Sequence, residues 1–315
     1  MNIQEKFKEI VAEVNRLKEV RKVNVKAIAD RLGIERTSAY ALLKGELTRK
    51  NGNRNFSDAV INKLYSQLIE KAAPIDITSF QFLSGLSDGC QSNGLMAVVT
   101  GKAGVGKSTT LKHVCNSREN AYYILCNHLD STEDFIEKIH SALGLKEVIA
   151  RGKKKRKLMI ESIIDFTYRQ ENIPLLILDD IHHLGTAVYQ DLKVLFDGTE
   201  NMLGILLVGT PTLEENLKKW AGYDIDWKAR YKPRAIMPEL VRRFKDNFYQ
   251  VPQLQQSDLK KILDAYKIAD AMIARHFIKL PHFELGMFTD KLENACRIRE
   301  QDKSIEVNLE LILSL

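Results

Sequence analysis

The stretch Gly101-Lys102-Ala103-Gly104-Val105-Gly106-Lys107-Ser108 matches the pattern G-x-x-x-x-G-K-[ST] at every fixed position. An apolar run from Met96 to Val99 precedes it, and a helical pattern begins at Lys107. Glycines allow backbone N–H groups to turn inward around a phosphate, and the N-terminus of the following helix adds a positive dipole end. The motif therefore predicts a strand–loop–helix phosphate site within an α/β fold.

The loop and the first turn of the helix are the expected nucleotide-binding residues. Lys107 would reach the β- and γ-phosphates, and the Ser108 hydroxyl would ligate Mg²⁺. The full set is Gly101, Ala103, Gly104, Val105, Gly106, Lys107, Ser108 and Thr109. The expected cofactors are ATP and Mg²⁺.

A second motif, Leu175-Leu176-Ile177-Leu178-Asp179-Asp180, is a buried strand that ends in two carboxylates. Asp179 would bind Mg²⁺ through water, and Asp180 would orient or deprotonate the attacking water. His182 and His183 come two and three residues after Asp180. Because no further His or Cys lies at a suitable spacing, we interpret His183 as a group near the phosphate and His182 as packed or exposed, rather than as metal ligands.

Two further segments supply candidate catalytic residues. Thr210 follows the apolar run 204–208, where it would contact the γ-phosphate or the lytic water; the alternative is a helix N-cap. Arg243 lies just before Phe244 and suits an arginine that reaches a neighbouring subunit's nucleotide. Arg242 is the alternative candidate for this role. The other interpretation is that both arginines lie in a solvated basic turn and contact no nucleotide.

The order of the apolar runs predicts the architecture. Short runs at 95–100, 121–126, 175–178, 204–208 and 248–251 alternate with helical segments, which predicts a five-stranded, mostly parallel sheet covered on both faces. After Pro252 the pattern is helical only, at about 257–275, 286–299 and 307–313.

The N-terminal quarter has a different character. Residues 1–80 carry 15 Lys and Arg against 10 Asp and Glu, and helices at about 25–32 and 35–43 flank Gly33. A helix, a tight turn and a helix form a helix-turn-helix outline, and one more helix is expected from Phe56 to Leu68. We therefore expect a helix-turn-helix DNA-binding domain at 1–73, a breaker-rich linker at 74–94, a nucleotide-binding core at 95–252 and a helical lid at 253–315.

Composition excludes several classes of protein. The 315 residues carry a net charge of +6, too mild alone to establish a nucleic-acid partner. The four cysteines lie far apart, which argues against a zinc ribbon and a disulfide framework. No run approaches the ~20 apolar residues of a membrane helix, and the polar N-terminus contains no signal-peptide run. We expect a cytoplasmic protein with no membrane partner.

Taken together, these motifs resemble an AAA+ ATPase. The run 176–185, the strand end Val208-Gly209-Thr210-Pro211-Thr212-Leu213 and the order of the domains are similar to target-DNA-selecting transposition ATPases of the bacteriophage Mu B type. Two positions depart from this pattern. Asp180 stands where most relatives carry Glu, and Gly286-Met287-Phe288-Thr289 offers no arginine where such lids often supply one; Arg297 is the nearest alternative.

The resemblance implies an ATP-dependent DNA-binding protein that assembles on target DNA and delivers it to a transposase. It implies duplex DNA without strong sequence specificity, a transposase, and a homo-oligomer or helical filament as partners, in a bacterial or phage-infected cell. The ATPase would be slow and stimulated by DNA and self-assembly. A helicase loader and an ATP-gated helix-turn-helix regulator remain the alternatives.

Two basic surfaces are candidates for DNA contact. The first is the expected recognition helix, with Arg36, Thr37, Ser38, Tyr40 and Lys44, although such folds also dock proteins. The second is the run 151–157, whose cations would neutralise phosphates, with a solvated loop as the alternative. Its members are Arg151, Lys153, Lys154, Lys155, Arg156 and Lys157.

Overall fold

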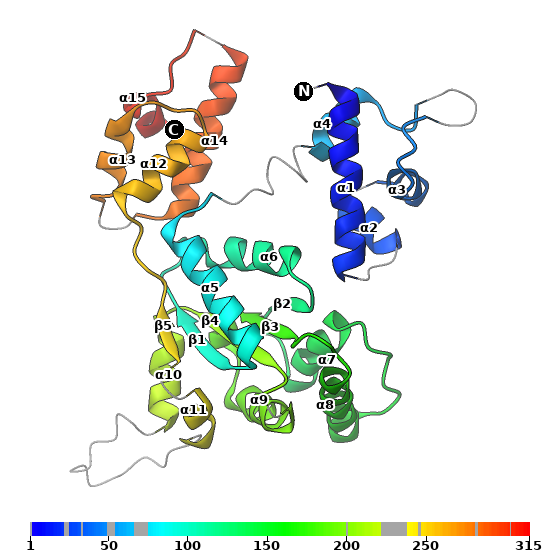
Figure 1. Ribbon diagram of the computed structural model, residues 1–315. Helices are drawn as coiled ribbons and strands as arrows, with labels where there is room; N and C mark the ends of the chain where they lie inside the picture. The colour runs from blue at the N-terminus through cyan, green and yellow to red at the C-terminus, as the bar shows by residue number, and fades with distance from the viewer. Residues whose placement is uncertain are drawn as a thin grey trace, which may run out of the picture. The chain divides into compact units, whose positions relative to one another are not determined.

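The chain forms two compact units in the computed structural model (Figure 1): Met1–Pro74 with Cys115–Asn120, and Ile75–Val114 with Ala121–Leu315. The structure describes residues 2–21, 25–32, 34–48, 54–65, 75–199, 201–221, 238–244, 247–280, 283–302 and 304–315. Within these ranges, no helix combines the length and the apolar character needed to cross a membrane.

The N-terminal unit is helical throughout its described elements. They are α1 (Ile3–Arg21), α2 (Val25–Leu32), α3 (Arg36–Leu43) and α4 (Asp58–Tyr65). The apolar spacing of α1 places Ile10 and Val14 in a buried core that also contains Leu42 of α3 and Ile61 of α4. The helices expected at 25–32 and 35–43 agree with α2 and α3, because the apolar periodicity specifies which face each helix buries.

Residues 74–94, expected to be a linker, contain the helix α5 (Thr78–Asn93). Gly85 and Gly89 lie inside this helix, and a Cβ at either position would meet open space. Each internal glycine costs roughly 1 kcal/mol relative to alanine. Leu83 is fully buried, which shows how tertiary packing stabilises a helix that its composition alone disfavours.

The second unit is built on one parallel sheet with the strand order β2-β3-β4-β1-β5. The strands are β1 (Met96–Thr100), β2 (Ala121–Leu125), β3 (Leu175–Asp179), β4 (Gly204–Gly209) and β5 (Phe248–Gln250). All paired strands run parallel, so the five predicted strands are confirmed. The three inner strands are buried at every residue, as continuous apolar runs in a sheet covered on both faces require.

Helices cover both faces of the sheet (Figure 1). They are α6 (Lys107–Ser117), α7 (Thr132–Ala142), α8 (Gly152–Tyr168), α9 (Thr186–Thr199), α10 (Pro211–Ala221) and α11 (Pro238–Phe244), with the short 3₁₀ helix η2 (Ile181–His183) after β3. Alternate strand residues such as Val98, Leu178 and Leu207 face the core that α7 to α11 cover. Figure 1 shows α5 and α6 on the other side of the sheet.

The basic run at 151–157 is helical rather than a loop. It forms the N-cap and the first turns of α8, which begins at Gly152 with φ +55°. Met159, Ile160 and Ile163 of the same helix are buried against the sheet. The segment is therefore a helix and not a loop, because the apolar residues that follow it fix the whole segment as a helix. Contact of its cations with DNA stays a prediction.

The C-terminal residues fold into α12 (Gln256–Ala265), α13 (Ala271–Phe277), α14 (Leu285–Gln301) and α15 (Leu309–Ser314). The helix expected at about 257–275 is two helices. Lys267 takes a left-handed conformation with φ +55°, and the Asp270 side chain then caps α13 by accepting the N–H of Met272. The sequence did not predict this break, because the apolar periodicity continues across it and the turn contains no Gly or Pro.

Candidate nucleotide-binding site

The phosphate loop connects β1 to α6 with the backbone shape that its motif predicts. Gly104 and Gly106 have φ values of +73° and +85°, which residues with a side chain rarely adopt. The Gly101 N–H donates to the carbonyl of Gly209 at 3.1 Å, which joins the start of the loop to the end of β4. The helix begins at Lys107, so its N-terminal N–H groups face the loop.

Lys107 is almost buried, at 8% exposure, and its ammonium donates to the carbonyls of Gly101 at 2.8 Å and Lys102 at 2.9 Å. Burial lowers the pKa of Lys107, and attraction to Asp179 and Asp180 opposes this shift. The ammonium and the two carboxylates are therefore within electrostatic range. The structure brings together the lysine and the acid pair that the two motifs predict.

Asp179 ends β3 and is fully buried. Its Oδ1 accepts the N–H of Asp180 at 3.0 Å, and its Oδ2 accepts the hydroxyl of Tyr123 at 2.5 Å. Tyr123, on β2, is a member of the candidate site that the sequence did not reveal. It is one of several tyrosines in apolar surroundings, and only strand pairing brings it to Asp179.

The donor set fits magnesium. Asp179 and Ser108 offer a carboxylate and a hydroxyl, and Mg²⁺ prefers oxygen ligands. Across the described ranges no Lys, Arg or His forms an ion pair with Asp179. Lys107 attracts this buried carboxylate without forming an ion pair, and a divalent cation would compensate the rest of its charge.

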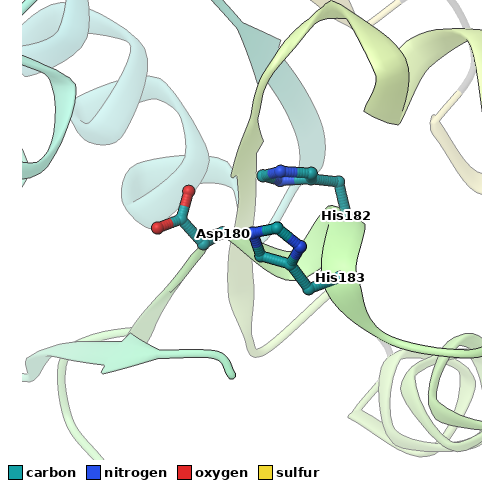
Figure 2. A group of neighbouring side chains, drawn as sticks. All are labelled: Asp180, His182 and His183. Carbon is teal, nitrogen blue, oxygen red and sulfur yellow. The ribbon is translucent and has the colours of Figure 1, made fainter. Parts of the chain in front are cut away.

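Asp180 and the two histidines form a compact group (Figure 2). The metal-ligating atoms of Asp180, His182 and His183 all lie within 4.8 Å of one another, and the two imidazole rings are 4.0 Å apart. The sequence analysis did not interpret the histidines as metal ligands, because no further His or Cys lies at a suitable spacing. Two imidazoles and a carboxylate are a set that suits a transition metal, and they equally suit hydrogen bonds to a water.

The conformation of this group is constrained. Asp180 has φ +57°, a left-handed conformation that is uncommon outside glycine. It turns the chain sharply from β3 into η2, so that His182 packs beside Gly209 at the end of β4. Burial lowers the pKa of His182, and the neighbouring His183 adds to the effect. His182 is therefore predominantly neutral at neutral pH.

Thr210 comes directly after β4 and directly before α10. Because β4 lies between β1 and β3, Thr210 leaves the same edge of the sheet as the phosphate loop and Asp179. Its backbone carbonyl accepts the N–H of Leu213 at 2.9 Å, as the first turn of α10 requires. The position between the two motifs agrees with the prediction; the contact with phosphate stays a prediction.

The start of α14 lies against the phosphate loop. The N–H of Gly286 donates to the carbonyl of Gly104 at 3.2 Å, and a Cβ at Gly104 would lie 2.9 Å from the Cβ of Glu284. The 286–289 segment was the expected place for a contact between the lid and the nucleotide, and Gly286 provides a backbone contact with the loop. Arg297 is further along α14 and bonds to Asn294 instead.

Arg243 is paired within its own chain. Its Nε and one terminal nitrogen donate to the two carboxylate oxygens of Asp197 on α9, at 2.6 and 3.1 Å. This two-point bond raises the pKa of Arg243 and lowers that of Asp197. Both side chains are more than one-third exposed, so the pair contributes little to stability. Arg242 is also exposed.

The candidate DNA-binding residues of α3 occupy its outer face. Arg36, Thr37, Tyr40 and Lys44 are exposed and Ser38 is partly exposed, whereas Ala39 and Leu42 are buried. The Arg36 guanidinium lies 6.0 Å from the centre of the Tyr40 ring. The polar face is therefore open to a ligand, as the prediction requires.

The cations of α8 divide into two groups. Lys155 bonds to Glu137 at 2.9 Å and Glu133 at 3.3 Å on α7, and Arg156 lies 3.5 Å from Asp191 on α9. Lys157 pairs with Glu161 of the next turn at 3.6 Å. Within the described part of the chain, Arg151, Lys153 and Lys154 are exposed and form no ion pair. Only this second group has its charge fully available to a phosphate backbone.

Comparisons with known proteins agree with the α/β fold of the second unit. Residues 90–217 match the family model described as the AAA domain. The match contains the phosphate loop, Asp179 and the end of β4, and together with the five-stranded parallel sheet it fits a P-loop AAA+ core. No curated protein sequence matches the chain.

Three solved structures share the fold. The Aeropyrum pernix ORC1 protein, solved in complex with DNA, has a TM-score of 0.52 at 15% identity, over 75% of this chain and 63% of that one. The A. pernix ORC2 protein, solved as ADPNP-ADP complexes, has a TM-score of 0.54 at 14% identity, over 74% and 65%. Cdc6p from Pyrobaculum aerophilum has a TM-score of 0.50 at 16% identity, over 71% and 62%. The chain thus spans less than two thirds of each of these structures.

Proposed function

We propose that the chain binds Mg²⁺-ATP at the loop 101–108 and hydrolyses it. The observation that supports this best is the convergence of Lys107, Asp179 and Asp180 beside a glycine loop that has the backbone shape of a phosphate cradle. The match of residues 90–217 to the AAA domain is consistent with it.

Each group has a distinct chemical role in this proposal. Lys107 exchanges its bonds to the loop carbonyls for the β- and γ-phosphate oxygens, and Ser108 and Asp179 hold Mg²⁺, which neutralises charge on the phosphates. Asp180 orients the attacking water or accepts its proton, with His183 beside it. Asp180 is one methylene shorter than the Glu of related sites, so turnover is slow.

The test is equilibrium binding of a fluorescent ATP analogue to the full chain, with Mg²⁺ and with EDTA, followed by a phosphate-release assay. Lys107→Ala removes the cation that faces the phosphates. Lys102→Ala is the matched control, because Lys102 is an exposed cation of the same loop and supplies only its backbone carbonyl to Lys107. Equal ATP affinity in the wild type and Lys107→Ala would contradict the proposal.

The second part of the proposal is binding to duplex DNA through α3 and the start of α8. The exposed polar face of α3 and the unpaired cations of α8 support it. The structural likeness to an ORC1 protein in complex with DNA is consistent with the same class of ligand. Because phosphate contacts carry no sequence information, this binding is expected to be largely independent of sequence and sensitive to salt.

The third part concerns biological role. We propose that ATP-loaded subunits assemble on target DNA and deliver it to a transposase, a role supported by the sequence resemblance at 176–185 and 208–213. Electron microscopy with plain duplex DNA and ATP should then show polymers on any sequence. A discrete complex with a helicase would favour a loader instead, and a footprint on one operator would favour an ATP-gated regulator.

A further inference from the structure

Tyr123 lies on the edge strand β2, which pairs with β3 so that Tyr123 is opposite Ile177 and Leu125 is opposite Asp179. The neighbouring Tyr122 points to the other face of the sheet, where its ring packs 6.4 Å from that of Phe166. Two consecutive tyrosines therefore have separate surroundings: Tyr122 lies in the core under α8, and Tyr123 lies beside the phosphate loop.

Tyr123 contacts one of the residues expected to hold magnesium. Its hydroxyl donates to Oδ2 of Asp179 at 2.5 Å. The Lys112 ammonium, from the second turn of α6, lies 5.3 Å from the centre of the Tyr123 ring. A phenol with contacts to α6, β2 and β3 is held in place on three sides.

The direction of this hydrogen bond follows from the chemistry of the two groups. A carboxylate has no proton, so the phenol donates its only hydrogen to Asp179. Burial and the bond to Asp179 both raise the pKa of Tyr123, so the phenol keeps that hydrogen.

The carboxylate of Asp179 is held at both oxygens. The Tyr123 phenol donates to Oδ2, and the N–H of Asp180 donates to Oδ1 at 3.0 Å. One side chain and one backbone group thus set the orientation of this expected magnesium ligand.

We propose that Tyr123 is a positioning residue of the magnesium site, acting through the Asp179 carboxylate rather than as a ligand. The inference rests on the proposed Mg²⁺-ATP function. Partners that orient metal ligands typically change metal affinity by 10–100-fold when they are removed. The Tyr123 hydroxyl therefore sets how much Mg²⁺ the nucleotide complex requires.

The test compares Tyr123→Phe with Tyr122→Phe in the full chain. Both variants keep the ring and lose one hydroxyl, from opposite faces of the same strand. Binding of a fluorescent ATP analogue is measured in EDTA and across a Mg²⁺ titration, and the unfolding temperature is recorded for each protein. For Tyr123→Phe we expect the half-saturating Mg²⁺ concentration to rise about 10-fold or more, with unchanged affinity in EDTA. Tyr122→Phe should match the wild type in both.

Three outcomes would overturn the inference. The first is a wild-type Mg²⁺ titration in Tyr123→Phe. The second is an equal shift in Tyr122→Phe, and the third is a loss of affinity in EDTA, since both would indicate a general disturbance of the strand. If the wild type binds no nucleotide, or binds it without any dependence on Mg²⁺, the proposed function itself fails. That result is distinguishable because it requires no variant.

Discussion

Lys107 and Lys155 illustrate two ways in which the surroundings of a lysine are specified. Lys107 occupies a fixed position in a motif, and the loop backbone supplies its hydrogen-bond partners, the carbonyls of Gly101 and Lys102. Lys155 belongs to a run of cations, and its partners Glu133 and Glu137 come from another helix. A motif with fixed spacing encodes local geometry, whereas a charge run leaves its partners to tertiary packing.

The largest effect is expected at Lys107, where the motif is most specific. Lys107→Ala should abolish ATP binding, since truncating a buried, hydrogen-bonded charge costs roughly 2–5 kcal/mol, or about 30-fold and more in affinity. Calorimetric titration with Mg²⁺-ATP measures it, with Lys102→Ala as the control. If both variants lost the same affinity, the general charge of the loop would matter more than its geometry.

The next largest effect is expected at Asp180, which follows the last residue of β3. Asp180→Asn should retain ATP binding and lower turnover by about 10²-fold or more, the usual contribution of a general base. Asp180→Glu restores the longer side chain of related sites and should be at least as fast as the wild type. Single-turnover phosphate release measures both. Unchanged turnover in Asp180→Asn would transfer the role to the adjacent His183.

Arg243 shows what happens when a candidate catalytic cation has a partner in its own chain. ATPase activity should rise with protein concentration and with DNA, and Arg243→Ala should lose this stimulation while retaining ATP binding. The loss should be smaller than the 10³–10⁵-fold typical of an arginine supplied in trans, because Asp180 is short. Asp197→Asn releases the guanidinium and should move the stimulation to lower protein concentration.

An experiment that mixes two variants distinguishes a catalytic site shared between subunits from a site within one subunit. Lys107→Ala and Arg243→Ala subunits together should recover activity, since one mixed interface pairs an intact loop with an intact arginine. Activity that is independent of concentration, with no recovery on mixing, would identify the Arg243–Asp197 pair as purely structural.

The smallest effect on DNA binding is expected for the cations of α8, where the exposed and the acid-paired side chains should differ. Replacing Lys153 and Lys154 by Gln should make the slope of log K against log salt for duplex binding shallower by about 0.9 per lost phosphate contact. Replacing Lys155 and Arg156 by Gln should alter the slope less, because their charges are already paired with acids of the same chain. Equal changes would mean that these ion pairs open on DNA.

Much of the fold could be predicted because the sequence pattern of each strand agrees with its place in the sheet. Each strand is a short apolar run, and the glycines of the loop identify β1 without any knowledge of its neighbours. The helix α5 could not be predicted, because Gly and Ser disfavour a helix that burial stabilises. The break at Lys267 could not be predicted either, since the residue has no intrinsic preference for a left-handed conformation.

The site divides in the same way. Lys107, Ser108 and Asp179 follow from motifs, but Tyr123 lies 56 positions before Asp179 and meets it only through the register of β2 on β3. The contact of Gly286 with Gly104 depends on how the C-terminal helices pack, which no local pattern encodes.

The buried carboxylate of Asp258 has a mechanical consequence. It accepts both the N–H and the hydroxyl of Thr78 at 2.9 Å, and Lys261 donates to the carbonyl of Asp76. The stretch that enters α5 is therefore tied to α12. If α12 rotates, either residues 76–78 move with it or a buried acid loses its two donors from Thr78 and keeps only the N–H of Gln255, at about 1–3 kcal/mol for each group left unsatisfied. A movement of α12 is thus coupled to the first residues of the second unit.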